Sequence, residues 1–412
     1  MFISKCRMCS GSSFYKFLDL TQTPPADQFL FAEQLKQPQQ SYPLEVVVCE
    51  TCSLVQLNYV VPPEILYCDD YPYESSTTKA GRSHWNEFAE TTVRLLALEK
   101  KDLVIDVGSN VGVLLQMFRN HGTTVLGVDP AGNIAEIANK NGIETLPVFF
   151  NSETARGIVT SKGHASVITG TNVFAHVDDL HDFMQATDIL LNENGVLIIE
   201  APYFLELLQN VEYDTIYHEH LSYLSLKPLK RFFESFNMEV FEVQRRDIHG
   251  GSFRVFVRRR GVSERPVSGV VAELLAAEEY AKAYDHATLD KFARDVAQNR
   301  TDLRRLLLDL KRSGKSVVGV SAPAKGMTLL NYCGIGTDIL DFVAEKSKLK
   351  IGRFTPGGHI PVVSDDVLLE RQPDYALLLA WNFAEEIMNN LKQFSERGGK
   401  FIIPIPNPKI VG

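Results

Sequence analysis

The stretch EYDTIYHEHLSY, residues 212 to 223, gathers histidines, tyrosines and carboxylates into twelve positions. Three interpretations are open for such a group of side chains: a metal site, an acid/base site, or a polar turn that is rich in histidine. The residue types alone do not decide between them. The spacing of the residues and the motifs elsewhere in the chain have to be considered.

The spacing within this stretch does not favour a metal. A zinc protease would need H-E-x-x-H, and a facial triad would need H-x-D/E together with a distant histidine. Here His218 and Glu219 are adjacent, and the H-x-H formed by His218 and His220 has no evident third ligand.

The acid/base interpretation depends on one pair of side chains. If the segment is helical, Tyr217 and His220 share a face, whereas His218 and Glu219 point away. A histidine that titrates near neutrality can accept a carbon-bound proton, and a tyrosine hydroxyl can donate a hydrogen bond to the enolate oxygen that forms. The pair therefore suits proton abstraction next to a carbonyl, followed by methyl transfer to carbon. The alternative is a polar helix cap with solvated histidines.

An earlier glycine turn indicates the cofactor. In LVIDVGSNVGVLLQMF an apolar strand leads through Asp106, Gly108 and Gly112 into an amphipathic helix. A dinucleotide fingerprint would need glycine at 110 and 113, where the chain has Asn110 and Val113. The loop lacks the close glycine approach of a pyrophosphate site, so we predict S-adenosylmethionine, which has a charged amino-acid end and no phosphate. A purely structural strand-helix turn is the alternative.

Two later strands end in polar residues that would meet the same cofactor. VLGVDP places Asp129 at the end of a strand, where a carboxylate can bind both ribose hydroxyls. TGTNVFAHVDDL brings Asn172 and His176 to the same carboxyl edge of the sheet, where ligands of α/β proteins bind. For His176, a surface histidine at a helix start is an equally good interpretation.

Two C-x-x-C pairs, CRMC and CETC, predict a zinc site formed by Cys6, Cys9, Cys49 and Cys52. Four thiolates from two such knuckles can surround one Zn²⁺ tetrahedrally. Disulfides would be unexpected in a reducing cytosol, and a redox motif would need only one pair. Because no open ligand position is evident, we expect the zinc to be structural.

The elements that must position these residues follow from the hydrophobic pattern. From residue 102, strand-like runs such as LVIDVG, TVLGVDP, ASVITGTNV and GVLIIEAP alternate with helical segments, which predicts an α/β fold with a doubly wound, mostly parallel sheet. Residues 238–259 read as two further strands that pair as a hairpin-like edge. A helical connector over 268–312 and a second α/β pattern from 315 follow.

We therefore predict three parts: a small zinc-binding module over 1–72, a Rossmann-like S-adenosylmethionine methyltransferase domain over 73–262, and a helical connector with a C-terminal α/β domain over 263–412. The first part, rich in Pro and Gln, could hardly fold without its metal. The formal charge of −9 argues against a nucleic-acid partner. Apolar runs far shorter than the ~20 residues of a membrane span, and no signal-peptide core at the start, lead us to expect a cytoplasmic protein that does not bind membranes. Nothing in the sequence demands an oligomer, so we expect a monomer.

Taken together, these motifs resemble a known family, the bacterial nucleotide-deoxysugar C-3′-methyltransferases. The resemblance covers nearly the whole chain, and its marks are CRMC, CETCSLVQL, DYPYESS, DVGSNVG, NVFAHV, YHEHLSY, HGGSFR, APAKGMTLLNY and PGGHIPV. It implies a zinc-containing enzyme that methylates C-3′ of a nucleoside-diphosphate 4-keto-6-deoxy sugar with S-adenosylmethionine.

The resemblance also implies roles for single residues. The family's base is the histidine of a Y-x-E-H motif, which falls on Tyr217, Glu219 and His220. The histidine of NVFAH and a tyrosine of a Y-x-Y stretch line the family's site, which implies His176 and either Tyr71 or Tyr73.

The substrate's nucleotide would meet residues of the last third of the chain. Lys325, near a predicted helix N-terminus, could meet the diphosphate, with Lys350 and Arg353 as further candidates and His249 of HGGSFR as another substrate contact. A solvated side chain on a loop is the alternative for each of the three cations. EKSKLKIGRF also departs from the shorter polar segment that is typical of the family.

Two other functions remain open from the sequence. One is an O- or N-methyltransferase that acts on a related nucleotide sugar, and the other is a non-catalytic zinc-containing scaffold that retains a degenerate cofactor fold. The sequence does not indicate the nucleotide, the C-3′ substituent or the stereochemical outcome.

Overall fold

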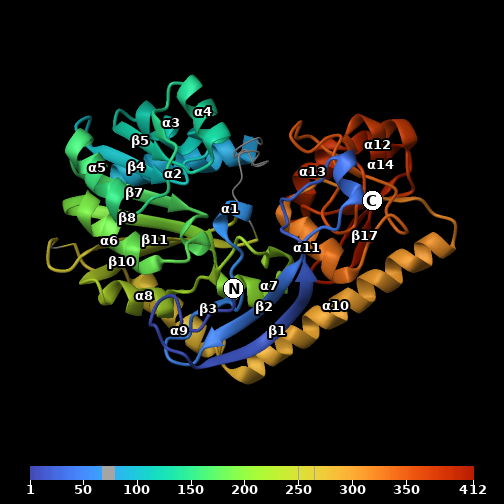
Figure 1. The fold of residues 1–412 in the computed structure, drawn as a ribbon, viewed down its shortest axis with the longest axis horizontal. Coiled ribbons are helices and arrows are strands. Elements are labelled where there is room, and N and C mark those ends of the chain that lie inside the picture. The colour runs from blue at the N-terminus through green and yellow to red at the C-terminus, as the bar shows by residue number, and fades with distance from the viewer. Residues whose placement is uncertain (67–78, 249, 264) are drawn as a thin grey trace.

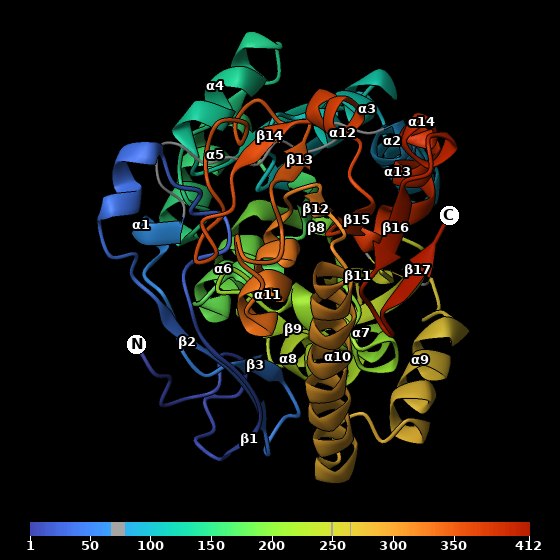
Figure 2. The same ribbon diagram turned by 90° about the vertical axis from the view of Figure 1, so that its right-hand side faces the viewer.

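The computed structural model describes residues 1–66, 79–248, 250–263 and 265–412. Tyr71, Tyr73 and His249, which we expect to contact the substrate, lie outside the described residues. Two α/β lobes lie side by side, and a small N-terminal sheet lies against both of them (Figure 1, Figure 2).

The N-terminal sheet is antiparallel and contains a strand from the middle of the chain. Its order is β1-β2-β3-β9. The strands are β1 (Phe14–Thr23), β2 (Tyr42–Cys49), β3 (Val55–Leu57) and β9 (Ser222–Tyr223). Because β9 consists of the last two residues of the histidine-rich stretch, this sheet fixes one end of that stretch.

The first lobe is built on a seven-stranded sheet in the order β10-β11-β8-β7-β4-β5-β6. The five strands from β8 to β6 are parallel, whereas β11 pairs antiparallel with β8 and β10 antiparallel with β11, as predicted for a hairpin edge. The strands are β4 (Leu103–Val107), β5 (Thr124–Val128), β6 (Thr145–Leu146), β7 (Ala165–Thr171), β8 (Leu191–Pro202), β10 (Met238–Arg246) and β11 (Ser252–Arg259).

Helices cover both faces of this sheet, as the alternating pattern predicts (Figure 1). They are α2 (Lys79–Leu96), α3 (Val113–Asn120), α4 (Gly132–Lys140), α5 (Ser152–Lys162), α6 (Leu180–Leu190) and α8 (Leu226–Glu234). The short helix α7 (Phe204–Asn210) follows β8 and buries Phe204 and Leu207 in the core that also contains residues of β1 and β2. In α3 the apolar residues Leu114, Leu115 and Phe118 recur at helical spacing and are buried, which seats the helix directly behind the glycine turn.

The second lobe follows a helical connector made of α9 (Gly269–Tyr280) and α10 (His286–Arg312). Its six-stranded sheet has the order β14-β13-β12-β15-β16-β17 and is parallel except for β17. The strands are β12 (Val317–Val320), β13 (Val343–Glu345), β14 (Val362–Ser364), β15 (Tyr375–Leu378), β16 (Lys400–Ile403) and β17 (Lys409–Val411). The helices that accompany this sheet are α11 (Ala324–Cys333), α12 (Asp366–Arg371), α13 (Ala384–Asn390) and α14 (Lys392–Glu396).

The hydrophobic cores join the three parts. Cys6, Met8 and Leu54 of the cysteine knuckles belong to the same core as the strands of the first lobe. Residues of β1 and β2, among them Leu20 and Val46, belong to the core that also contains α10 and α11. The N-terminal sheet is therefore packed against both lobes and helps to set their relative position.

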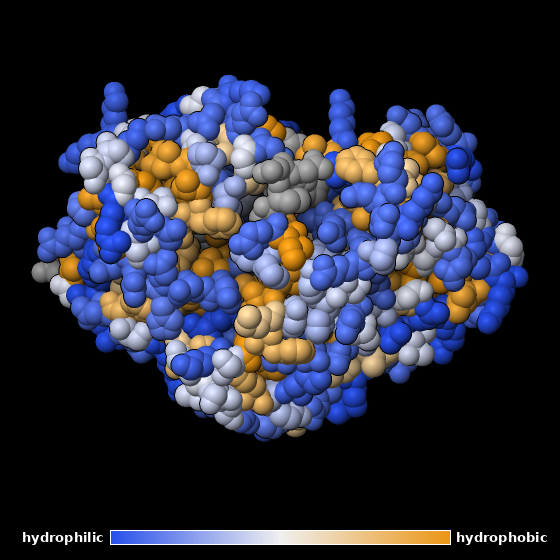
Figure 3. Space-filling view, in the orientation of Figure 1, coloured by the Kyte–Doolittle hydropathy of each residue, from blue (hydrophilic) through white to orange (hydrophobic). Residues whose placement is uncertain are grey.

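No helix of the described chain is long and apolar enough to cross a lipid bilayer. The face drawn in Figure 3 is mainly hydrophilic, with several apolar patches, some of them near the middle of the view.

Candidate active site

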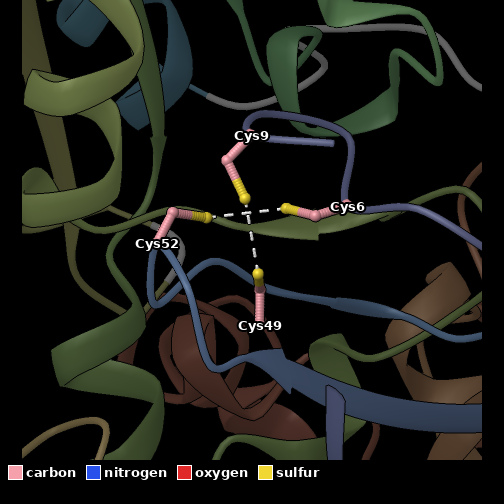
Figure 4. A group of neighbouring side chains, drawn as sticks. All are labelled: Cys6, Cys9, Cys49 and Cys52. Atoms are coloured by element: carbon pink, nitrogen blue, oxygen red, sulfur yellow. Dashed lines mark hydrogen bonds between the residues drawn. The ribbon is translucent and has the colours of Figure 1, made fainter. Parts of the chain in front are cut away.

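The four cysteines of the two C-x-x-C pairs converge, as predicted. Their sulfur atoms all lie within 4.8 Å of one another, and the Sγ–Sγ distances Cys6–Cys52 and Cys9–Cys49 are each 3.5 Å (Figure 4). A hydrogen bond with the Cys52 thiol lowers the pKa of Cys6 to about 4, which makes Cys6 a thiolate at neutral pH. Four soft ligands around one point, three of them buried, fit a tetrahedral structural zinc.

The glycine turn that we predicted as the cofactor loop lies at the carboxyl end of β4. Gly108 and Gly112 have φ values of +66° and +81°, and Asn110 is left-handed with φ +49°. A Cβ on Gly108 would come within 2.2 Å of Val173. Glycine is therefore required at 108 by backbone conformation and by the close approach of the loop that carries His176.

Two carboxylates lie beneath this loop. Asp129, at the end of β5, accepts hydrogen bonds from the backbone N–H of Asn110 (2.8 Å) and of Ala131 (2.9 Å). Each carboxylate oxygen can accept a second bond, so both remain suited to ribose hydroxyls. Asp106 is fully buried and accepts a 2.6 Å hydrogen bond from the Thr169 hydroxyl; burial raises its pKa to about 7.

The histidine-rich stretch is not a helix, so the condition under which we paired Tyr217 with His220 is not met. A 3₁₀ turn over Tyr213–Thr215 is followed by a tight turn, in which His220 N–H donates to the Tyr217 carbonyl at 2.9 Å, and then by β9. The turn nevertheless brings Tyr217 and His220 together, because both ends of a tight turn lie on one side. The Tyr217 hydroxyl lies 2.8 Å from Nε2 of His220.

The hydrogen bonds of His220 assign its two ring nitrogens. Nδ1 lies 2.7 Å from the carbonyl oxygen of Thr215, which can only accept, so Nδ1 carries the hydrogen. In the neutral imidazole Nε2 is then the basic nitrogen, and the Tyr217 hydroxyl donates to it. These contacts therefore assign His220 as the Nδ1–H tautomer, with Nε2 as the base.

His176 lies beside this base. The ring centroids of His176 and His220 are 4.9 Å apart, and the two histidines line a small cavity together with Asn172, Thr215, Ser222 and Tyr223. Burial, and secondarily the neighbouring His220, lower the pKa of His176 well below its usual value. His176 is therefore neutral and able to donate a hydrogen bond without adding a charge.

The other two polar residues of the turn face different surroundings. His218 donates from Nε2 to the Tyr42 carbonyl of β2 at 3.3 Å, and burial lowers its pKa to about 4. His218 is a neutral residue of the packing between the turn and the N-terminal sheet. Glu219 is also buried, at 3% exposed. The structure thus separates His218 from His220, which spacing alone did only on the assumption of a helix.

The zinc knuckle reaches the loop that carries His176. Arg7, next to Cys6, donates from Nε to Asp178 at 3.0 Å, and His181 donates to the carbonyl of Met8 at 3.0 Å. These links were not apparent from the sequence because the partners are about 170 positions apart.

The three cations that we predicted to contact the nucleotide, Lys325, Lys350 and Arg353, lie in different surroundings. The Lys325 ammonium, at the start of α11, lies 3.8 Å from Asp214 and 4.5 Å from the ring centroid of Trp381. Lys350 is buried and donates to Asp27 (3.0 Å) and to the Ala322 carbonyl (2.9 Å). Lys350 therefore joins the N-terminal part to the second lobe. Because its ammonium is buried and already donates to two groups, it is poorly placed to bind the diphosphate.

Arg353, the third predicted cation, has its guanidinium 4.4 Å from the ring centroid of Phe31. The contact lies between the second lobe and the segment that connects β1 and β2, and it uses one face of the guanidinium.

Sequence reasoning missed a buried ionic group at the end of β8. Glu200 accepts hydrogen bonds from Arg254 (2.7 Å) and His84 (2.5 Å). Burial opposes ionisation of Glu200, but His84 and Arg254 outweigh it and lower the pKa. The backbone carbonyl of Glu200 also accepts from Asn172 N–H at 2.8 Å, so the group holds one edge of the cofactor site.

Comparisons with family models divide the chain into three consecutive matches. A model described as "Putative zinc binding domain" matches residues 6–67, a methyltransferase domain matches 82–243, and a C-methyltransferase C-terminal domain matches 247–406. C-methyltransferase NovU of Streptomyces niveus is 38% identical over 409 residues, 99% of this chain and 97% of the relative. A ubiquinone biosynthesis O-methyltransferase of Bartonella tribocorum is 25% identical, over 27% of this chain and 46% of its own.

Solved structures of methyltransferases match less than half of the chain. A methyltransferase of Anabaena variabilis has a TM-score of 0.34 at 15% identity and covers 46% of this chain and 98% of its own. Magnesium protoporphyrin IX methyltransferase of Synechocystis has a TM-score of 0.33 at 11% identity, over 45% of this chain and 86% of its own.

Proposed function

The chain belongs to the C-methyltransferase family of its Streptomyces niveus relative and is an S-adenosylmethionine-dependent C-methyltransferase with a zinc-binding domain, and from this premise we propose that its acceptor is C-3′ of a nucleoside-diphosphate 4-keto-6-deoxy sugar. The observation that carries the proposal is the assigned base: Nε2 of His220 is free of hydrogen because Nδ1 donates to Thr215. Methylation at carbon requires such a base next to a carbonyl, since carbon must first lose a proton.

The residues of the turn supply the chemistry that this acceptor needs. The C-4′ ketone acidifies the C-3′ hydrogen, and Nε2 of His220 takes it as a proton. For this step the Tyr217 hydroxyl, which donates to Nε2 in the substrate-free site, turns to the substrate oxygen and exposes the Nε2 lone pair. The C–H electron pair becomes the enolate, whose oxygen accepts hydrogen bonds from Tyr217 and the neutral His176. Glu219, the acidic residue of the Y-x-E-H motif, precedes His220 in the chain, and we include it in the proposed site.

Bound S-adenosylmethionine supplies an electrophilic methyl group, which the C-3′ carbon of the enolate takes up while the neutral thioether leaves. The residues that would hold the cofactor are those around the glycine turn, namely Asp106, Gly108, Asn110, Gly112, Asp129 and Asn172. The proton on His220 is returned to solvent before the next turnover.

The second lobe would hold the nucleotide. Lys325 is the cation best suited to the diphosphate, because it lies at the start of a ten-residue helix whose N-terminus also attracts anions. Its ammonium has no hydrogen-bond partner within the described chain, and the Asp214 carboxylate is 3.8 Å away. An anionic ligand could take that ammonium without breaking a hydrogen bond within the described residues.

A deuterium experiment tests the proposal. The enzyme is given a panel of 4-keto-6-deoxy sugar nucleotides labelled with deuterium at C-3′, and products are analysed by mass. We expect gain of one methyl with loss of the label, and washout without methylation when S-adenosylhomocysteine replaces the cofactor. Methylated product that keeps the label would point to an O- or N-methyltransferase instead. No turnover of any panel member would remove the proposed substrate class.

A further inference from the structure

The hydrogen-bond acceptor that orients His220 is itself held by the second lobe. The Thr215 carbonyl belongs to the backbone and cannot reorient by a change of rotamer. Its direction therefore depends on the backbone conformation of residues 214 to 216. Side chains of the second lobe reach the residue on each side of it, Asp214 and Ile216.

The contact before Thr215 is made by an indole. Nε1 of Trp381, in the turn after β15, donates to Oδ2 of Asp214 at 2.6 Å, and Asp214 is fully buried. The bond is short, and breaking it would leave a polar atom of a fully buried side chain without this partner, which carries a desolvation penalty.

The contact after Thr215 is made by a hydroxyl. Oγ1 of Thr328, in α11, donates to the Ile216 carbonyl at 3.0 Å, and Thr328 is 3% exposed. The segment therefore has one anchor at 214 and another at 216, both from the second lobe, with the carbonyl that bonds His220 between them.

We propose that Trp381 and Thr328 are positioning residues of the methyl-transfer reaction: they hold the Asp214–Ile216 segment so that the Thr215 carbonyl keeps the hydrogen of His220 on Nδ1 and the lone pair on Nε2. The second lobe then does more than bind the sugar nucleotide, because it selects the tautomer of a base that belongs to the first lobe. This inference rests on the proposed role of His220.

The physical reason is the near-equality of the two tautomers of a free imidazole. Without a fixed acceptor at Nδ1, the hydrogen can move to Nε2, where the Tyr217 oxygen can accept it as well as donate. An Nε2–H imidazole cannot abstract the C-3′ proton. A loosened Thr215 carbonyl therefore lowers the fraction of enzyme that is competent, without removing any group that touches the substrate.

The experiment compares Thr328→Val and Trp381→Phe with a matched control. Thr187→Val removes another buried hydroxyl that donates to a backbone carbonyl, at 2.9 Å, but in α6 and away from the site. We expect each test variant to lower kcat about tenfold, with the KM for both substrates within about twofold of wild type, and Thr328→Ser to restore most of the rate. Thr187→Val should retain the wild-type kcat in the fraction that folds.

A second measurement, by ¹⁵N NMR, reports the tautomer of His220 and does not depend on turnover. In protein labelled with ¹⁵N at histidine, the His220 signals of wild type should show a protonated Nδ1 and an unprotonated Nε2, and those of Thr328→Val should show a mixture. Unchanged tautomers in both test variants would overturn the inference, as would an equal fall in kcat for Thr187→Val. Because this arm needs no substrate, its result stands even where every member of the sugar panel fails.

Discussion

The chemistry of His220 depends on its hydrogen-bond partners. The Thr215 carbonyl accepts a hydrogen bond from Nδ1, so the lone pair of the imidazole is on Nε2, 2.8 Å from the Tyr217 hydroxyl. His218, two positions away, has a lowered pKa of about 4 because it is buried against β2. The two histidines of one short stretch thus have different roles because their surroundings differ.

Replacing the base should abolish proton abstraction while leaving the cofactor site intact. For His220→Gln we expect turnover to fall by about 10³-fold or more, because general-base catalysis and the enolate are lost together. S-adenosylmethionine affinity, measured by calorimetry, should stay within about twofold. The exposed His121, changed to Gln, serves as the control, and a His220→Gln enzyme with substantial activity would refute the assignment.

Asp106 gives a prediction for stability against pH. Burial raises its pKa to about 7 from an ordinary value of 3.8, so between these values the folded protein holds a proton that the unfolded chain has lost. Stability therefore falls as the pH rises through this window. Denaturant unfolding of the cofactor-free protein should show that wild type loses on the order of 2 kcal/mol relative to Asp106→Asn between pH 5 and pH 8. Parallel curves for the two proteins would mean that Asp106 ionises normally.

At the scale of elements, the reactive turn is held because it runs directly into a strand. In β9, Ser222 pairs with Gln56 and Tyr223 with Val55, and the Leu221 carbonyl accepts from Leu57 N–H at 2.9 Å. The strand has only two residues, so a single substitution can disrupt its pairing with β3.

A proline at the start of β9 should detach the turn from the N-terminal sheet. Ser222→Pro fixes φ at 222 and restricts the backbone of Leu221, whose carbonyl accepts from Leu57 N–H, so we expect a fall in kcat of more than about tenfold with S-adenosylmethionine affinity little changed. Ser222→Ala keeps the backbone and is the control. If Ser222→Pro retained the wild-type kcat, the pairing of β3 with β9 would have no part in positioning His220.

At the scale of the whole molecule, the zinc-binding part connects the two lobes. Its knuckles share a core with the first lobe, β1 and β2 share a core with α10 and α11, and Arg7 reaches Asp178 in the loop that carries His176. Loss of the metal should therefore disturb the site as well as the module.

Cys6→Ser should reduce zinc content from one per chain to well below one, measured by atomic absorption. Because a structural zinc site contributes folding free energy, we expect a fall in Tm of about 10 °C or more together with weaker S-adenosylmethionine binding. Cys333→Ala removes a buried thiol outside the cluster and should keep the full zinc content. A soluble, fully active and zinc-free Cys6→Ser protein would contradict the structural role.

Local patterns were enough to predict the alternating strands and helices from residue 102, the hairpin edge of β10 and β11, the helical connector and the cysteine cluster. Each of these depends on residues that are close in the chain or on a ligand spacing with few alternatives. The turn at 212–223 was not predictable in this way, because its polar residues fit a helix as well as a turn. Lys350 was misassigned because its partner, Asp27, lies 323 positions away.

The sequence by itself determined the fold class and the convergence of the four cysteines, and it predicted the cofactor loop, because these follow from periodicity and from the chemistry of residue types. It selected Tyr217 and His220 only through an assumed helix and a family resemblance. Only the tertiary structure decided which nitrogen of His220 is basic, that His218 is part of the packing, and that both lobes and the N-terminal sheet hold the turn. The reason is physical: a tautomer or a pKa depends on the atoms around a ring, and here those atoms come from strands and helices that are distant in sequence.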